Sequence, residues 1–346
     1  MKRRMLWRVS GMVLTGLIGF GIWSYNRTIQ ERSCTRVLFA MDTIMNFTAY
    51  GRNCEKAVET AVQEVQRLDA LLSTENASSE VSGLNRAGGG TISEDTAELF
   101  GRGMDIYEKT GGLFDFTIYP LMQLWGFPSK EYHVPTQEEL GEVLPLVDAS
   151  KVSFTEEEAH LGEGQQVDFG GIAKGYTSGR VMEIYQEYGV SSGMVSLGGN
   201  VQVYRRRPDG SLWRIGIRDP EGGPEDMAAM VEVEDCAVVT SGGYERYFEE
   251  DGNTYIHILD PKTGYPAEGD LASVTVISGD GTLADALSTS LYIMGMEDAV
   301  SYWRTYRDDF EMILITEEGT IYATEGVSGQ LQSRRDIRII TEQIKL

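Results

Sequence analysis

The sequence has few of the residues on which sulfur- or histidine-based sites depend. Its three cysteines are Cys34, Cys54 and Cys236, and its three histidines are His133, His160 and His257. No two cysteines have the Cys-x-x-Cys spacing, so neither a disulfide framework nor a thiolate zinc site is expected. Three histidines are too few for a histidine-rich metal cluster. Any histidine that acts as a general base must be one of these three.

Basic residues are also scarce. The 346 residues include 30 Lys and Arg against 53 Asp and Glu, which gives a formal net charge of −23. Such a surface repels phosphate backbones, so nucleic acid is excluded as a partner. The composition, 41% hydrophobic and 24% charged, is that of a globular protein. Carboxylates are abundant enough to bind hard cations, although most of them belong to a solvated surface.

The N-terminus carries a membrane-targeting pattern. A basic flank, residues 1–8, precedes an uncharged stretch over residues 9–26, which is short but sufficient for crossing about 30 Å of hydrocarbon. Because basic flanks stay in the cytoplasm, residues 27–35 are expected to be an external linker and 36–346 an extracytoplasmic domain. No small-x-small cleavage site follows the stretch, which favours an uncleaved signal anchor. A lipoprotein anchored through Cys34 is disfavoured because Glu31, Arg32 and Ser33 do not form a lipobox.

Helical and strand patterns alternate along the rest of the chain without a regular βαβ period, which predicts an α+β fold with one catalytic unit. Helices are expected over residues 54–72, from the Ser93 cap to Gly111, after the turn at 168–171, and over 283–294. Residues 37–50, 272–278 and 310–316 are expected to form strands, and 128–165 a peripheral segment. Hairpins are expected to turn at 208–210 and at 251–252.

Three short patterns contain groups that could carry chemistry. Asp168-Phe-Gly-Gly-Ile-Ala-Lys174 places two glycines just before a helix, where free N–H groups favour an anion. Asp285 and Thr289 are four residues apart on a predicted helix and share one face, an oxygen-only pair suited to magnesium. His257 ends an alternating strand beside a Pro/Gly-rich turn, where a general base could lie. Each pattern alone is also consistent with an ordinary cap, turn or surface position.

In combination, eight blocks in order make the chain closely similar to the ApbE family, the FAD:protein FMN transferases. The blocks are Met41-Asp42-Thr43, LLST (71–74) with SSEVSGLN (78–85), GGLFDFT (111–117) with WGF (125–127), VDFGGIAKGY (167–176), VSLGGN (195–200), TSGGYER (240–246), HILDPKTGYP (257–266) and ADALST (284–289). The similarity extends from Met41 to about Ala299.

The resemblance implies an Mg²⁺-dependent enzyme that cleaves FAD, links FMN by a phosphoester to a Thr or Ser of an acceptor protein, and releases AMP. It implies that the acceptors are membrane-associated electron-transfer proteins with covalent FMN. The implied magnesium ligands are Asp285, Thr289 and the carbonyl of Gly171. The implied flavin-nucleotide contacts are Met41, Leu113, Phe114, Asp115, Asp168, Lys174 and Leu259. His257 matches the histidine that helps to deprotonate the acceptor hydroxyl; a fixed positive charge from Lys174 beside the anion is our own inference.

The chain departs from the family pattern at three positions. Asp42 replaces the glycine of the usual Met-Gly-Thr, and we expect its side chain to point to the opposite face of a strand. Glu75 stands where many relatives have a tyrosine, and Gly243 where an aspartate is frequent. Two other functions remain open: a magnesium-dependent FAD pyrophosphatase that produces FMN and AMP, and an extracytoplasmic flavin-binding protein without catalysis.

Overall fold

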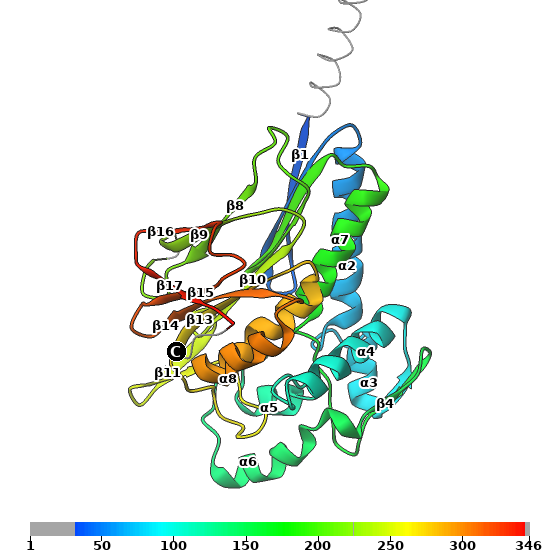
Figure 1. Cartoon of the computed structure of the whole chain (residues 1–346). Coiled ribbons are helices and arrows are strands. Elements are labelled where there is room, and N and C mark those ends of the chain that lie inside the picture. Colours follow the sequence, from blue (N-terminus) through cyan, green and yellow to red (C-terminus); the bar gives the residue numbers. More distant parts are fainter. Residues whose placement is uncertain (1–31, 224, 343–346) are drawn as a thin grey trace, which may run out of the picture.

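The computed structural model describes residues 32–223 and 225–342. Its centre is a nine-stranded sheet in the order β1-β2-β6-β7-β10-β13-β14-β15-β17, antiparallel except for the parallel pair β15–β17 (Figure 1). Its strands are β1 (Ser33–Ala40), β2 (Thr43–Tyr50), β6 (Ser192–Leu197), β7 (Asn200–Tyr204), β10 (Ala237–Gly242), β13 (Leu271–Ser278), β14 (Glu311–Thr316), β15 (Ile321–Thr324) and β17 (Ile337–Ile340).

Long helices cover one face of this sheet, and a small sheet covers part of the other. The helices are α2 (Cys54–Leu72), α7 (Ala173–Glu187) and α8 (Gly281–Tyr306). The small sheet has the order β16-β9-β8, built from β8 (Trp213–Arg218), β9 (Met227–Val233) and β16 (Leu331–Ser333). Apolar side chains of both sheets meet in one buried cluster that includes Val203, Ile215 and Ile313. This layering is the α+β architecture that the sequence predicts.

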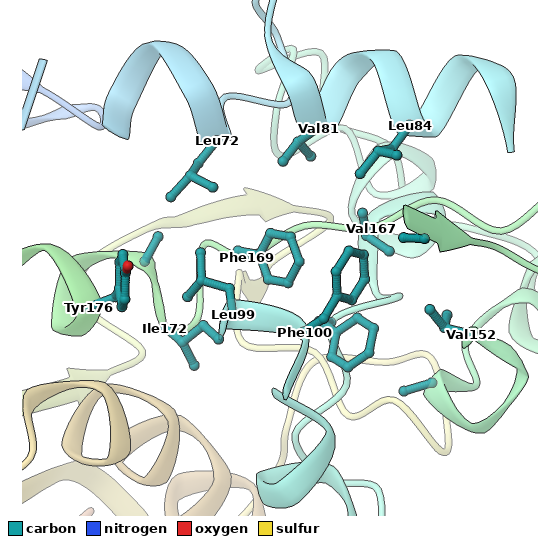
Figure 2. Close-up of a cluster of buried hydrophobic side chains, with 14 of the residues drawn as sticks. Leu72, Val81, Leu84, Leu99, Phe100, Val152, Val167, Phe169, Ile172 and Tyr176 are labelled. Atoms are coloured by element: carbon teal, nitrogen blue, oxygen red, sulfur yellow. The ribbon is translucent and has the colours of Figure 1, made fainter. Parts of the chain in front are cut away.

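Shorter elements form the end of the molecule next to α2 and α8 (Figure 1). They are α3 (Glu80–Ala87), β3 (Gly89–Thr91), α4 (Glu94–Lys109), α5 (Tyr119–Leu124), α6 (Gln137–Val143), the 3₁₀ turns Leu144–Leu146 and Ala149–Lys151, β4 (Ser153–Phe154), β5 (Glu158–His160), β11 (Tyr247–Glu250) and β12 (Asn253–Ile256). In the core of this end, Phe100 of α4 packs against Phe169 (Figure 2). Phe116 packs against the edge of the Phe100 ring and completes an aromatic cluster. It anchors the segment that continues into the 168–171 turn.

Several predicted elements are confirmed. The helix from Cys54 to Leu72 is α2, Ser93 caps α4 through its side chain, and the turn at Asp251-Gly252 joins β11 to β12. The predicted helix at 283–294 is part of the longer α8, which continues past a non-helical Gly295.

Two predictions of strand connectivity are wrong. Residues 37–50 do not form one strand: Met41 and Asp42 have φ values of 46° and 58°, and the chain reverses there into the β1–β2 hairpin. A turn does form at residues 208–210, but the strands on either side diverge. The earlier strand, β7, pairs with β6 and β10, whereas β8 pairs with β9. Local sequence patterns mark where a chain turns, and the partner of each strand is decided by distant burial.

The expectation of no disulfide is also wrong for one pair. Cys34 in β1 and Cys54 at the start of α2 are bonded, with Cα atoms 5.6 Å apart. The β1–β2 hairpin brings the two together although 20 residues separate them, a spacing that carries no motif. Cys236 is the free cysteine of the described residues, and burial raises its pKa to about 12.

The predicted membrane segment, residues 9–26, lies outside the described residues. Within residues 32–223 and 225–342, no helix has both the length and the apolar character that a membrane crossing requires. The first strand begins at Ser33, inside the segment predicted to be a linker.

Candidate active site

A cavity of about 680 Å³ opens between the β1–β2 turn, the start of α7, β10 and the first half of α8. All residues that the sequence nominated for the site line it: Met41, Leu113, Phe114, Asp115, Asp168, Gly171, Lys174, His257, Leu259, Asp285 and Thr289. These positions run from residue 41 to residue 289 of the chain, and the fold brings them to one place. Their individual roles remain predictions.

The 168–171 turn packs on the buried aromatic cluster with one side and presents polar groups to the cavity with the other. Phe169 and Ile172 are fully buried in the aromatic cluster, whereas Asp168, Gly170 and Gly171 line the cavity. The carboxylate of Asp168 accepts a hydrogen bond from the N–H of Gly170 at 2.8 Å. Burial raises the pKa of Asp168, and this donor opposes the rise. The alternation of buried and exposed positions thus fixes the backbone of Gly171 at the cavity wall.

Asp285 caps the start of α7 from the neighbouring helix. Its Oδ2 accepts the backbone N–H of Gly175 at 2.8 Å, and its Oδ1 lies 4.0 Å from Nζ of Lys174. The sequence predicts an anion at this helix terminus, and in the structure the Asp285 carboxylate is an anion at that position. Burial raises the pKa of Asp285, while the charge of Lys174 and the Gly175 N–H oppose that rise.

Thr289 lies one helical turn beyond Asp285, on the cavity side of α8 as its spacing predicts. Its hydroxyl is 3.2 Å from the hydroxyl of Ser241 in β10, which in turn is 2.8 Å from the hydroxyl of Ser288. This hydroxyl chain ties α8 to the sheet and limits the rotamers of Thr289.

His257 directly follows β12, at the strand end that the sequence predicts. Its backbone N–H donates to the carbonyl of Arg246 at 3.0 Å, and its Nδ1 is 3.1 Å from the same oxygen. Because a carbonyl only accepts, Nδ1 carries the proton and Nε2 keeps its lone pair. Burial and the positive charges of Arg246 and Lys174 lower the pKa of His257 to about 4. At neutral pH the ring is therefore an uncharged base.

The residues that the resemblance assigns to the flavin nucleotide also hold the local structure together. Both carboxylate oxygens of Asp115 accept local hydrogen bonds, Oδ1 from the N–H and hydroxyl of Thr117 and Oδ2 from the N–H of Ala149. The Phe114 ring packs beside Gly171, where an added Cβ would approach it to 3.1 Å. Leu259 is 4% exposed and bridges to Pro266. These residues shape the wall of the cavity.

The expected orientation of Asp42 is wrong. Asp42 belongs to a turn, so the alternation of a strand does not apply, and both Met41 and Asp42 line the cavity. An Asp42 carboxylate oxygen lies 3.8 Å from the guanidinium of Arg246. The extra carboxylate therefore has a cationic partner at the rim.

Sequence reasoning missed three polar residues of the cavity. Asn200 is fully buried, and neither atom of its side-chain amide has a hydrogen-bond partner among the described residues. Glu245 is a second carboxylate, and burial raises its pKa. Arg218 adds a positive charge from β8. Asn200 and Glu245 were visible in the motif blocks at 195–200 and 240–246, but nothing in those blocks ranks one polar residue over another.

The donor set of this site fits a hard cation. It combines one buried carboxylate, one hydroxyl and a backbone carbonyl with the unpartnered Asn200 amide, whose oxygen is a further donor. Groups of three or more His, Cys, Asp or Glu that could hold a metal are absent from the described part of the chain. Magnesium is compatible with such a sparse oxygen set because it completes its shell with water and substrate phosphate oxygens.

The fold and the cavity define an α+β protein whose site unites a neutral imidazole, cations and oxygen donors, the groups that a group-transfer enzyme needs. The chain matches the ApbE family over residues 41–314 and belongs to it.

Known proteins of this family resemble the chain over most of its length. It is 30% identical to the FAD:protein FMN transferase of Treponema pallidum (strain Nichols) over 360 residues, covering 97% of this chain and 98% of that protein. It is 32% identical to the FAD:protein FMN transferase of Klebsiella pneumoniae (strain 342), covering 77% and 84%. The crystal structure of the ApbE protein of Thermotoga maritima superimposes with a TM-score of 0.80 at 31% identity, covering 86% of this chain and 99% of that one. The family resemblance and the α+β fold are thus confirmed.

Proposed function

We propose that the chain is a magnesium-dependent FAD:protein FMN transferase. It would cleave the pyrophosphate of FAD, link FMN to a Thr or Ser hydroxyl of an acceptor protein, and release AMP. The observation that carries the proposal is the meeting of His257, Asp285, Thr289 and the Gly171 backbone at one cavity. The names of the similar proteins support the same activity.

His257 is the base in this proposal. Nδ1 is committed to the Arg246 carbonyl, so Nε2 takes the proton of the acceptor hydroxyl. The alcohol oxygen then forms a bond to the phosphorus of the FMN half, the anhydride P–O bond breaks, and AMP leaves with the electron pair. A positioned base of this kind contributes roughly 10²–10⁴-fold to the rate.

The positive and oxygen-bearing side chains supply the remaining functions. Lys174 and Arg246 face the cavity and would attract the diphosphate. Asp285, Thr289 and the Gly171 carbonyl would hold Mg²⁺, which when bound neutralises developing charge on the phosphate oxygens.

The metal assignment is tested by chelation. EDTA should abolish FMN transfer, and added Mg²⁺ should restore it. In calorimetry without FAD, Mg²⁺ should raise the Tm of the wild type, and Asp285→Asn should lose this rise. Activity that survives chelation would remove magnesium from the proposal.

One observation keeps the FAD pyrophosphatase as a second candidate. Glu75 stands at the position where many relatives have a tyrosine, and it is exposed at the cavity. Because no aromatic ring covers the cavity at this position, water has access to it. Incubation with FAD and Mg²⁺ separates the two functions. FMN released without an acceptor favours hydrolysis, and a flavin-labelled acceptor identified by mass spectrometry favours transfer. Failure of both reactions, with FAD still bound, would leave only a flavin-binding protein.

We infer that the enzyme is held at the outer face of the cell membrane by residues 9–26. The Cys34–Cys54 disulfide supports an oxidising compartment. It also occupies the thiol that a lipid anchor at Cys34 would need. The acceptors would then be membrane-associated electron-transfer proteins. Protease accessibility of the domain in intact cells tests this location.

A further inference from the structure

The outer end of the nine-stranded sheet carries an exposed apolar patch. Val37 and Phe39 in β1 are each 70% exposed, and Ile44 in β2 is 61% exposed. Phe39 and Ile44 are direct cross-strand partners, so their side chains lie together on one face. On the opposite face, Leu38 packs against the core under α2. We call Val37, Phe39 and Ile44 the hairpin patch.

The backbone beside this patch is open as well. β1 is the edge strand of its sheet, and β2 is its only strand neighbour in residues 32–223 and 225–342 (Figure 1). Edge strands usually carry charges, prolines or bulges that prevent pairing with another chain. β1 has one such charge, Arg36, and its residues nearest the turn are Val37, Leu38, Phe39 and Ala40. An apolar edge segment that has no second strand neighbour among the described residues is typical of a strand that receives a partner strand.

The hairpin patch leads directly into the active-site cavity. Met41, Asp42 and Thr43, the residues of the turn, line the cavity. At the rise of a β-strand, the turn lies about 7 Å beyond Phe39. A polypeptide that binds along β1 therefore arrives at the rim beside Asp42 and Arg246.

We propose that β1 and the hairpin patch are the docking surface for the acceptor polypeptide. This proposal rests on the proposed transferase function. An extended acceptor segment would add to the free edge of β1, cover Val37 and Phe39 with apolar side chains at alternate positions, and place its Thr or Ser in the cavity about two residues further on.

The features of the site select this occupant. The proposed reaction needs an acceptor protein whose Thr or Ser hydroxyl enters a cavity that also holds FAD. An extended segment is narrow enough to place a hydroxyl there. A second copy of this chain is disfavoured because each carries a net charge of −23, and the two would repel each other. The same charge favours an acceptor segment with neutral or basic flanks.

The test uses an acceptor domain that the wild-type chain labels with FMN on co-expression. Phe39→Ser and Val37→Ser remove exposed side chains, so both variants should fold with unchanged Tm. Each should raise the KM for the acceptor domain, and the double variant should raise it at least 10-fold. The KM for FAD and the kcat at saturating acceptor should stay within twofold of wild type. Ile339→Ser, on the opposite edge strand β17, is the matched control because Ile339 is also an exposed apolar residue.

Several results would overturn the docking proposal. An unchanged KM for the acceptor domain in the double variant would do so while leaving the transferase function intact. So would a wild-type dimer in sedimentation analysis that Phe39→Ser dissociates. Labelling of no acceptor domain by the wild type would remove both proposals.

Discussion

The carboxylate of Asp285 in α8 accepts a hydrogen bond from the backbone N–H of Gly175 in α7, across 110 residues of sequence. The contact depends on a close approach of the two helices. A Cβ on Gly175 would lie 2.1 Å from the carbonyl oxygen of Gly281, so only glycine fits this crossing. One small residue therefore sets the position of the carboxylate that we assign to the metal.

Gly175→Ala should disrupt both stability and activity. The added methyl group forces α7 and α8 apart, which should lower the free energy of unfolding by about 1–3 kcal/mol. Displacement of Asp285 should lower kcat about 10²-fold. Gly179→Ala in the same helix is the control, since no atom lies within 4 Å of its Cβ. It should leave activity unchanged and add up to about 1 kcal/mol of stability. Similar behaviour of the two variants would contradict the close-approach argument.

The pH dependence of the reaction should reflect the unusual environment of His257. Because the pKa of His257 is lowered to about 4, the ring stays an unprotonated base throughout the neutral range. Its contribution to the rate should be lost only as the pH falls through about 4, whereas an ordinary histidine would protonate near 6.5. The measurement is kcat/KM against pH, because this ratio reports the pKa values of the free enzyme. A decline centred near pH 6.5 would show that the ring is not held in this environment.

His257→Ala should lower kcat by about 10²–10⁴-fold and leave the Kd for FAD nearly unchanged. His133 is the control: its Nε2 contacts Glu139 at 3.1 Å on the surface, away from the cavity, so His133→Ala should have wild-type kinetics. Equal losses of turnover and FAD affinity in His257→Ala would make His257 a binding residue.

The Cys34–Cys54 disulfide should stabilise the domain. Closing a loop of this length contributes about 3 kcal/mol in the chain-entropy description. Cys34→Ser and Cys54→Ser should each lower the free energy of unfolding by about this amount, and a reductant should have no further effect on them. Denatured, oxidised wild type should contain one titratable thiol, that of Cys236. Three thiols in protein purified without a reductant would show that the bond does not form.

Asp42→Gly restores the residue usual in the family and tests the role of the Asp42–Arg246 pair. Glycine adopts the φ of 58° at this turn without steric cost, so stability should be equal or up to about 1 kcal/mol higher. Loss of the carboxylate 3.8 Å from Arg246 should free the guanidinium for phosphate and lower the KM for FAD several-fold at low salt. Asp251→Gly, at a φ of 51° in the remote β11–β12 turn, should match its effect on stability and leave the KM unchanged. An unchanged KM in Asp42→Gly would show that the pair does not modulate binding.

The sequence by itself determined much of this protein. The periodicity of residues 54–72, the cap at Ser93 and the Asp-Gly turn at 251–252 are local signals, and each forms the expected element. Every residue that the motif blocks nominated for the site lines the cavity. The motifs are informative because the chemistry of a site restricts which side chains can occupy its positions. The α+β class followed from the mixture of helical and strand patterns.

Only the tertiary structure decided how these pieces meet. The pairing of β8 with β9, the Cys34–Cys54 bond and the hydrogen bond from Gly175 to Asp285 all join residues whose spacing carries no signal. The reversal at Met41–Asp42 moved Asp42 from a strand face to the cavity rim. The low pKa of His257 likewise comes from burial and from Arg246 and Lys174, groups brought together by folding. Local propensity acts over a few residues, whereas contact, burial and electrostatics depend on distances that only the folded chain defines.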